Sequence, residues 1–339
     1  MCIRDSPPAQ AYCHGDEVSI VDLSNGSKRS LPFRQKPVKV FDAKLCSCNG
    51  ALILVVAVID GVQLWQLDAG IKSLRMLLCH NLSSGSKDGS DEVANPETAV
   101  FARGIARSQR GRHVCVGCSS GAVLVFGTAE PEVDVQLERW VPAHGSPVTA
   151  VAASTRGDDV VVSADEAGEL RLWELPSFTP RGRESDGKDR GLLDAGDARD
   201  PCTGLALVGA AACCGAFASG HVRVYDLASS YGKLAELQAH TRCVTALAVD
   251  DKGLELATVS EDSFLHVWSL EPRDGAAGDE AKADGADPSL ALTYSHQVTD
   301  AVLTGVQFVA PAPGAGKAPD VAVKAYDVDE VYILSLIHI

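Results

Sequence analysis

Residues Ala239–Leu270 read AHTRCVTALAVDDKGLELATVSEDSFLHVWSL, and this stretch defines the unit from which the rest of the chain is built. Three runs of alternating apolar residues, Val244–Val249, Leu254–Ser260 and Phe264–Leu270, are separated by the turn-forming sequences Asp-Asp-Lys-Gly and Glu-Asp-Ser. Alternation with a period of two is typical of half-buried strands, and Asp, Gly and Ser favour tight turns between them. The stretch therefore predicts an antiparallel β-meander.

Four polar side chains of this stretch, His240, Ser260, Asp262 and Trp268, have the chemistry of a connected network. A buried indole N–H needs an acceptor, which a Ser hydroxyl supplies while donating its own proton to a His. A carboxylate then fixes the other side of the imidazole. The sequence therefore predicts a structural polar network that joins three strands.

A second set repeats the first and consists of His144, Ser163, Asp165 and Trp173, with two additional residues between the Asp and the Trp. A Ser, a His and an Asp are also the components of a hydrolase triad. The recurrence of the set and the Trp at its end favour the structural interpretation. We therefore predict no catalytic residue.

A short alternating run ending at an aromatic position recurs along the chain, and we interpret it as the last strand of each unit. These runs are residues 17–23, 61–67, 121–126, 168–175, 220–227, 264–270 and 330–333. Repeated four-stranded units of this length are typical of propeller blades. The sequence predicts an all-β fold, a single seven-bladed β-propeller over residues 7–333, whose first blade is incomplete because of truncation at the N-terminus.

The two ends of the chain look foreign to the protein. Met1–Ser6 (MCIRDS) and Leu334–Ile339 (LSLIHI) can be encoded by one oligonucleotide and its reverse complement. Inverted copies at both ends resemble a sequencing adapter, so both segments are excluded from fold reasoning. We expect residues 1–6 and 334–339 to be adapter-derived and the protein to be a fragment.

The repeats resemble the WD-repeat β-propeller family, although Tyr225-Asp226 alone keeps an aromatic-Asp pair and Ala-His replaces Gly-His at His144 and His240. Longer strings resemble one branch of that family: AVFARGIA (99–106), VCVGCSSGAVLVF (114–126), QAHTRCVTAL (238–247), EDSFLHVWSL (261–270) and AYDVDE (325–330). The resemblance runs from about Ala51 to Glu330. It implies a cytoplasmic, non-enzymatic propeller that lacks an N-terminal strand here.

Charge and composition exclude several classes of partner. The formal net charge is −15, which argues against a phosphate-backbone interface and against binding to anionic membrane surfaces. The longest apolar run, Ala51–Ile59, is too short to span a bilayer, and no signal peptide opens the chain. We therefore expect no nucleic-acid partner, no membrane insertion and a cytoplasmic location.

Eleven cysteines are scattered through apolar runs rather than spaced as a disulfide framework, so reduced thiols are expected. Cys115 and Cys118 form a CxxC with His113 nearby, which raises zinc or redox chemistry as an alternative. Because no second ligand pair follows, we favour small buried side chains, as for Cys46/Cys48 and Cys213/Cys214. No metal and no cofactor are predicted.

Function is expected at loops or at the channel. Four insertions, Cys79–Glu97, Pro176–Asp200, Glu271–Ser289 and Ala310–Asp320, are predicted to emerge on one face, either as an acidic collar for a basic partner or as neutral expansions. Lys39 and Arg103 align with Thr149, Thr203, Thr245 and Thr304 on the inner strands. These two cations either contact a ligand at the channel mouth or extend into solvent.

We predict a non-catalytic scaffold that binds other proteins. The alternative is a subunit of a larger cytoskeletal or vesicle-associated assembly, and less favoured is a small-ligand binder or enzyme at the channel mouth. Homo-oligomerisation stays open. No phosphate-binding loop or nucleophile elbow supports catalysis.

Overall fold

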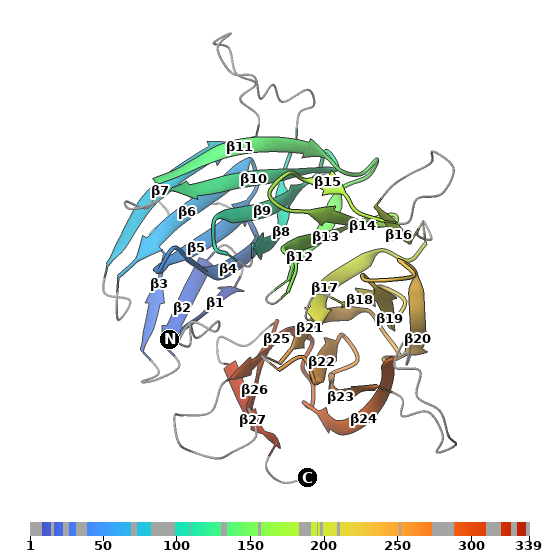
Figure 1. Cartoon of the computed structure of the whole chain (residues 1–339). Coiled ribbons are helices and arrows are strands. Elements are labelled where there is room, and N and C mark those ends of the chain that lie inside the picture. The colour runs from blue at the N-terminus through green and yellow to red at the C-terminus, as the bar shows by residue number, and fades with distance from the viewer. Residues whose placement is uncertain are drawn as a thin grey trace. The chain divides into compact units, whose positions relative to one another are not determined.

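The computed structural model describes most of the chain, and its regular elements are all β-strands (Figure 1). The described residues are 9–14, 17–22, 27–31, 39–68, 73–82, 99–108, 110–129, 134–154, 157–182, 191–194, 196, 199–208, 211–250, 252–272, 288–309, 320–326 and 331–336. The chain divides into two compact units, Met1–Cys202 and Thr203–Ile339.

The first unit contains four antiparallel sheets. The first sheet is β1 (Ala9–His14), β2 (Glu17–Asp22) and β3 (Lys28–Ser30). The second is β4 (Val40–Cys48), β5 (Ala51–Val58), β6 (Gly61–Leu67) and β7 (Leu74–Asn81). The third is β8 (Ala102–Arg107), β9 (His113–Cys118), β10 (Ala122–Ala129) and β11 (Asp134–Pro142). The fourth is β12 (Val148–Ala153), β13 (Val160–Asp165) and β14 (Leu170–Glu174), with β15 (Thr179–Pro180) and β16 (Leu192–Asp194) both paired to β14.

The second unit contains three sheets, the first of which begins at the boundary with β17 (Cys202–Val208) and continues with β18 (Ala212–Phe217), β19 (His221–Asp226) and β20 (Lys233–Gln238). The next is β21 (Val244–Val249), β22 (Glu255–Ser260), β23 (Phe264–Pro272) and β24 (Pro288–Gln297). The last is β25 (Leu303–Val309), β26 (Asp320–Ala325) and β27 (Val331–Ser335). Seven sheets are thus present among the described residues, but five of them have four or more strands, fewer than seven complete blades.

The run with the aromatic position is third in each four-stranded sheet, not last as the sequence analysis assumed. In the second sheet, for example, Gly61–Leu67 pairs on one side with β5 and on the other with β7. The fourth strands β7, β11, β20 and β24 are outer strands with largely exposed or half-buried residues. They lack a strong apolar alternation, so the sequence pattern did not reveal them.

This shift also changes where the insertions lie. Residues 83–98 follow β7 and precede β8, as predicted, but 273–287 connect β23 to β24 within one sheet and 310–319 connect β25 to β26. Residues 183–190 lie between β15 and β16, which pair with the same strand. In an antiparallel sheet, the connections from the first to the second strand and from the third to the fourth lie at one end of the strands. The connection from one sheet to the next lies at the other end. The prediction of one common face was therefore wrong, although the insertions themselves lie mostly outside the described residues.

The hydrophobic cores lie between neighbouring sheets, since the central strands are buried on both faces. In β5, Ile53, Val55 and Ala57 belong to a cluster with β8–β10, whereas Leu54, Val56 and Val58 pack with Val18 and Ile20 of β2. The sheet of β4–β7 is therefore held by the sheet before it and the sheet after it.

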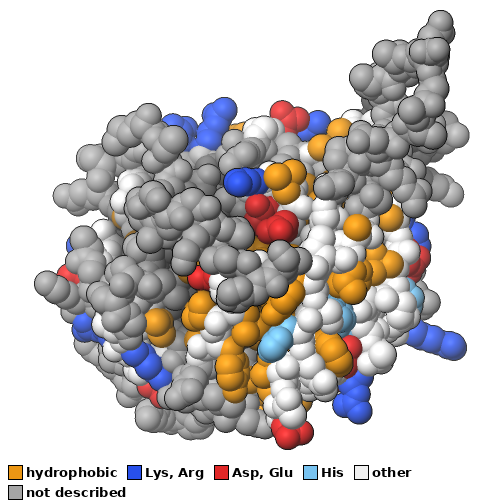
Figure 2. Space-filling model, turned by 90° about the horizontal axis from the view of Figure 1, so that it is seen from below, with side chains coloured by type: hydrophobic (Ala, Val, Ile, Leu, Met, Phe, Trp, Pro, Cys, Tyr) orange, Lys and Arg blue, Asp and Glu red, His pale blue; other side chains and the backbone are white. Residues whose placement is uncertain are grey.

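The surface carries exposed apolar side chains, and Figure 2 shows hydrophobic patches beside histidine side chains on the face seen from below. The exposed large hydrophobic residues in the described ranges are Ile59, Met76, Val100, Leu254, Leu292, Val302, Tyr326 and Ile333. The part of the chain that the structure describes contains no helix suited to crossing a bilayer.

Candidate functional site

The first polar network lies in the sheet of β12–β16 and includes His144, Ser163 and Trp173. The Trp173 indole N–H donates to Ser163 Oγ at 2.8 Å, and Ser163 Oγ lies 2.7 Å from His144 Nε2. Asp165 Oδ2 is 3.6 Å from His144 Nδ1 and accepts instead from the Ser146 hydroxyl at 2.8 Å. The structure thus joins three of the four predicted residues by hydrogen bonds, with the carboxylate beside them.

The second network, in the sheet of β21–β24, uses a different hydroxyl from the predicted one. Trp268 Nε1–H donates to Thr258 Oγ1 at 3.0 Å, and Thr258 Oγ1 lies 2.8 Å from His240 Nε2. His240 Nδ1 lies 3.1 Å from Asp262 Oδ1. Because a carboxylate only accepts, His240 is protonated on Nδ1, so Nε2 accepts from the Thr258 hydroxyl. The chain of hydrogen bonds runs from the Trp268 N–H through Thr258 and His240 to the Asp262 carboxylate, which accepts.

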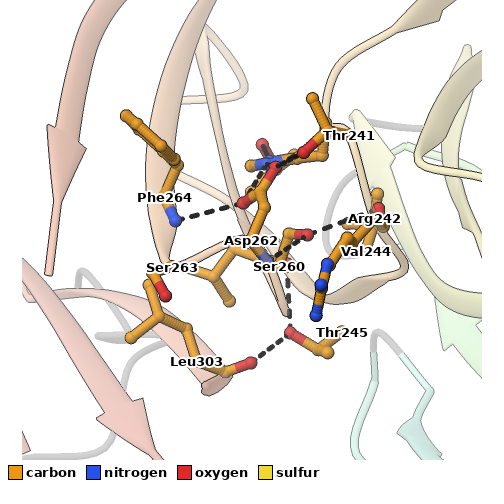
Figure 3. A network of polar contacts seen from close by, with 12 residues as sticks. Thr241, Arg242, Val244, Thr245, Ser260, Asp262, Ser263, Phe264 and Leu303 are labelled. Atoms are coloured by element: carbon orange, nitrogen blue, oxygen red, sulfur yellow. Dashed lines mark hydrogen bonds and ion pairs between the residues drawn. The ribbon is translucent and has the colours of Figure 1, made fainter. Parts of the chain in front are cut away.

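Ser260, predicted as the acceptor of the Trp268 N–H, has another role. Its hydroxyl donates to the Arg242 carbonyl at 3.3 Å and accepts from the Asp262 amide at 3.2 Å (Figure 3). The sequence analysis aligned the two sets on the spacing from hydroxyl to Asp. The structure instead preserves the spacing from hydroxyl to Trp, since Ser163 precedes Trp173, and Thr258 precedes Trp268, by the same number of positions.

Strand register explains this spacing. Trp173 pairs with Val161 and Trp268 with Leu256, and in each case the hydroxyl residue lies two positions further along the same strand. Side chains two positions apart on a strand lie on the same face of the sheet, so the hydroxyl lies on the same face as the indole of the neighbouring strand. The carboxylate lies beyond the residues that pair with the Trp-bearing strand: Asp165 ends β13, whereas Asp262 lies in the turn between β22 and β23.

Burial governs the ionisation of both networks. Burial lowers the pKa of His144 and of His240 below the ordinary value for histidine, although the neighbouring carboxylates oppose this. Burial raises the pKa of Asp262, but hydrogen bonds from the Thr241 and Phe264 amides and the contact with His240 outweigh it, so the pKa lies below its ordinary value (Figure 3). Both imidazoles are therefore neutral hydrogen-bonding groups near pH 7.

The cysteines of the CxxC lie in β9 and point to opposite faces of their sheet. Cys115 packs in the core cluster with Trp173, and Cys118 packs in the cluster with Ile53. Burial raises the pKa of both thiols, and the Cys118 thiol donates to the Ala122 carbonyl at 3.1 Å. Cys46 and Cys48 share the Cys118 cluster, and Cys214 packs against β22 and β23 residues. Because Cys115 and Cys118 lie on opposite faces of the sheet, their two thiols cannot bind one metal ion unless the strand is distorted.

The inner strands share a bulge, and this bulge corrects the alignment of Lys39 and Arg103. Thr149, Thr245 and Thr304 are the unpaired residues of their strands, and the corresponding residues are Phe41 in β4 and Gly104 in β8. Gly104 has a φ of +79°, and a Cβ there would lie 2.9 Å from the Val151 amide nitrogen. Lys39 and Arg103 therefore lie before the bulge rather than at the threonine position.

The bulge threonines of the second unit join successive inner strands. The Thr203 hydroxyl donates to the Val244 carbonyl at 2.5 Å, and the Thr245 hydroxyl donates to the Leu303 carbonyl at 2.6 Å (Figure 3). These two threonines tie neighbouring sheets together, whereas in β4 and β8 of the first unit the bulge positions hold Phe41 and Gly104.

In the first unit, those positions and their neighbours form an apolar surface that we call the mouth patch: Lys39, Phe41, Ile59, Val100 and Phe101. The Phe41 and Phe101 rings are stacked with centroids 4.8 Å apart, and Lys39 Nζ lies 5.1 Å from the Phe41 centroid. Ile59 forms a β-bridge with Phe101, and its amide donates to the Lys39 carbonyl at 2.9 Å. Ile59 is 37% and Val100 58% exposed.

Backbone contacts fix the position of the mouth patch. The Asp60 amide donates to the Val100 carbonyl at 3.0 Å, and the Ser119 hydroxyl accepts from the Val100 amide at 2.7 Å. Ile59 and Val100 are therefore exposed aliphatic side chains whose backbone is held by these hydrogen bonds. Sequence reasoning singled out Lys39 but missed Phe41, Ile59 and Val100, because each fits an ordinary strand pattern.

Comparisons with known proteins agree with the β-propeller fold. Two solved structures are similar: a chain of the mitotic checkpoint complex has a TM-score of 0.66 and 13% identity, covering 96% of this chain and 83% of that one. The β-propeller domain of Cps50 (Swd1) from Myceliophteria thermophila has a TM-score of 0.61 and 16% identity, covering 89% of this chain and 87% of its own. They confirm the predicted propeller class.

Sequence relatives are more specific. WD repeat-containing protein 54 of Mus musculus is 28% identical over 302 residues, 87% of this chain and 78% of the relative. The protein of the same name from Homo sapiens is 30% identical over 240 residues, 69% of this chain and 64% of the relative. The strings quoted in the sequence analysis resemble this protein, and that resemblance is confirmed. The profile of the WDR54 family matches residues 34–337, so the chain belongs to the WDR54 family.

Proposed function

We propose that the protein is a non-catalytic protein–protein interaction scaffold in the cytoplasm and that it binds its partner at the mouth patch. The observation that carries the proposal is the exposed aliphatic pair Ile59 and Val100 beside two stacked phenylalanine rings. Aromatic and aliphatic side chains on rigid backbone are typical anchors of protein interfaces. WD-repeat propellers are commonly interaction scaffolds, which agrees with this proposal.

The placement of exposed apolar residues supports this end of the sheets as the binding end. In the second unit, Val302 and Tyr326 are 41% and 69% exposed, and the Tyr326 amide donates to the Val302 carbonyl, just as the Ile59 amide donates to Lys39. Both units thus present apolar side chains where the first strand begins and the second ends. Leu254 is the one exposed large apolar residue found at a connection between first and second strands in the described ranges.

The cytoplasmic part of the proposal is supported by the thiols. The ten described cysteines carry thiols rather than disulfides, and most are buried, which suits a reducing compartment. Microscopy of the tagged native-length protein tests this point, and a signal confined to the secretory pathway would contradict it.

Proximity labelling in cells tests the scaffold. The native-length protein is compared with an Ile59→Asp/Val100→Asp variant and with Leu254→Asp/Leu292→Asp, a control in which two exposed apolar residues of the second unit receive the same added charge. We expect specific protein neighbours for the unmodified protein and the control, and their loss in the Ile59→Asp/Val100→Asp variant. Neighbours that persist in that variant, at equal protein level, would contradict binding at the mouth patch.

The alternative, a fixed subunit of a larger cytoskeletal or vesicle-associated assembly, differs in its native mass. A scaffold with exchangeable partners elutes from size-exclusion chromatography of cell extract partly as free chain. Exclusive elution in one large complex would favour the fixed subunit.

A further inference from the structure

Exposed cations lie on or beside the inner strands β4 and β8, and one of them, Lys39, belongs to the mouth patch. Lys39, Lys44 and Arg103 are exposed, and we call these three residues the cationic strip. The Lys44 ammonium donates to the Ile105 carbonyl at 3.1 Å, which ties β4 to β8. These three exposed cations belong to a chain whose formal net charge is −15.

Lys or Arg residues occur within inner strands β4 and β8, at Lys44, Arg103 and Arg107, and Lys39 directly precedes β4. Of the inner strands, β12 (VTAVAA), β17 (CTGLALV), β21 (VTALAV) and β25 (LTGVQFV) carry no Asp, Glu, Lys or Arg. If every inner strand required an exposed Lys or Arg side chain, these four strands would also contain one. The strip is therefore a local feature of β4 and β8.

The Asp42 carboxyl, which interacts with Lys44 and Arg103, neutralises the charge of the cationic strip only in part. Asp42 lies in β4, and burial raises the pKa of its carboxyl above the ordinary value, although Lys44 and Arg103 oppose this. A carboxyl that resists ionisation leaves positive charge on the surface around it. Asp60, at the turn after β5, is exposed and lies at the edge of the mouth patch.

The aromatic and aliphatic side chains beside the cationic strip indicate which kind of anionic ligand this surface would bind. A small anion such as phosphate makes no use of the stacked Phe41 and Phe101 rings or of exposed Ile59 and Val100. A peptide with acidic and apolar side chains uses both, since carboxylates pair with Lys and Arg while the apolar groups cover the rings.

We propose that the cationic strip and the mouth patch together bind an acidic segment of a partner protein that also carries aliphatic or aromatic residues. The proposal rests on the scaffold function above and names the chemistry of its partner. Lys39 and Arg103 pair with carboxylates, and Phe41, Phe101 and Val100 receive the apolar side chains. Long-range attraction from the strip raises the association rate against the repulsion of an otherwise acidic molecule.

Fluorescence polarisation with a defined probe tests the proposal. The probe is a fluorescein-labelled peptide of about ten residues, long enough in extended form to span neighbouring strands, with alternating Glu and Leu. The comparison peptides are an all-Glu peptide and an alternating Lys and Leu peptide. We expect binding of the Glu–Leu peptide that weakens as salt is raised, weaker binding of the all-Glu peptide, and no binding of the Lys–Leu peptide.

The variant for this measurement is Lys39→Glu/Arg103→Glu. Its control is Arg110→Glu/Lys252→Glu, which changes the net charge equally at exposed residues of the turns between first and second strands. We expect the first variant to weaken Glu–Leu binding by about tenfold or more, because both charge pairs become repulsive, and the control to change it by less than about twofold.

Two outcomes would overturn the proposal. The first is equal binding of the Glu–Leu peptide to Lys39→Glu/Arg103→Glu and to the unmodified protein. The second is that inorganic phosphate displaces the probe while the all-Glu peptide binds as well as the Glu–Leu peptide, since the site is then a simple anion site. The scaffold function is tested separately by the proximity labelling. If cellular neighbours are lost with Ile59→Asp/Val100→Asp but kept with Lys39→Glu/Arg103→Glu, the scaffold function is supported and the acidic partner is contradicted.

Discussion

The two polar networks make the same hydrogen bonds between a tryptophan, a hydroxyl residue and a histidine, but they differ in the hydroxyl residue and in the position of the carboxylate. In the sheet of β12–β16, Ser163 joins Trp173 to His144, and the Asp165 carboxylate stands 3.6 Å from the imidazole. In the sheet of β21–β24, Thr258 replaces the serine, and the Asp262 carboxylate bonds the imidazole directly at 3.1 Å. The indole, the hydroxyl and the imidazole keep their geometry, and the carboxylate does not.

The difference shows which part of the network is fixed by the fold. The hydroxyl and the indole lie on paired strands, so their relation follows from register and cannot drift without shifting the sheet. The carboxylate lies at the hairpin end, on the last residue of β13 in one sheet and in the turn after β22 in the other. The hydroxyl and the indole are therefore the structural core of each network, and the position of the carboxylate differs between the two.

The largest effect is expected from Thr258→Val. The substitution keeps the shape but removes the hydroxyl, which leaves the Trp268 N–H and the His240 Nε2 without their partner. Each orphaned buried group costs about 1–3 kcal/mol, so we expect the free energy of unfolding to fall by about 2–4 kcal/mol. Urea denaturation followed by circular dichroism measures the change.

The matched change in the other sheet is Ser163→Ala, which orphans the Trp173 N–H and the His144 Nε2. We expect a loss of similar size, because the two hydroxyls make the same two bonds. A Thr258→Val protein as stable as the unmodified one would show that the hydroxyl is not the centre of its network.

Replacing either tryptophan with phenylalanine is expected to have the next largest effect. Trp173→Phe and Trp268→Phe keep an aromatic ring but remove the N–H that the hydroxyl accepts. We expect each to lower the free energy of unfolding by about 1–3 kcal/mol, with the two values alike because the indole–hydroxyl pair is alike in both sheets. Thermal unfolding by calorimetry gives both values, and a large effect at one site with none at the other would contradict a shared core.

Much of the fold could be predicted from alternation and turn residues, which mark the buried inner three strands of a sheet. The outer strands were missed because water covers one side and packing there does not require a regular apolar pattern. In β20 (KLAELQ), Glu236 is paired with Arg223 at 2.8 Å and with Lys233 at 2.6 Å, contacts that no apolar periodicity reveals.

The site was less predictable, and Thr258 shows the reason. From the sequence, Ser260 and Thr258 are both hydroxyl residues in β22, and the choice between them depends on which position faces the indole across the hairpin. That depends on the register, which a turn of unknown length leaves open. The stacking of Phe41 on Phe101 likewise joins two separate sheets, so a linear pattern does not contain it.

Acid is expected to weaken the second network by a smaller amount. His266 stacks on His240 with centroids 4.5 Å apart, and burial, followed by the charge of His240, lowers the pKa of His266 to about 4. A histidine whose folded pKa lies below its unfolded value near 6.5 contributes stability above pH 6.5, and this is lost as pH falls toward the folded value. We expect the urea midpoint to decrease between pH 7 and 5.5.

The variant that isolates this effect is His266→Gln, with His296→Gln on the outer strand β24 as its control. The first is expected to flatten the pH dependence, and the second to leave it unchanged. Equal slopes for all three proteins would show that the histidine pair does not carry the acid sensitivity. The first network, whose imidazole has Asp165 and Glu169 nearby, is expected to contribute less to this slope.

The smallest effect is expected from Ser260→Ala, and it sharpens the comparison most. Ser260 is fully buried, but its hydroxyl makes long bonds, to the Arg242 carbonyl at 3.3 Å and from the Asp262 amide at 3.2 Å. Ordinary neutral hydrogen bonds contribute about 0.5–1.5 kcal/mol, so the loss should lie near the lower end of that range, well below that of Thr258→Val. Equal losses in the two variants would place Ser260 in the network after all, and a ratio clearly above one assigns the central hydroxyl to the residue that strand register selects.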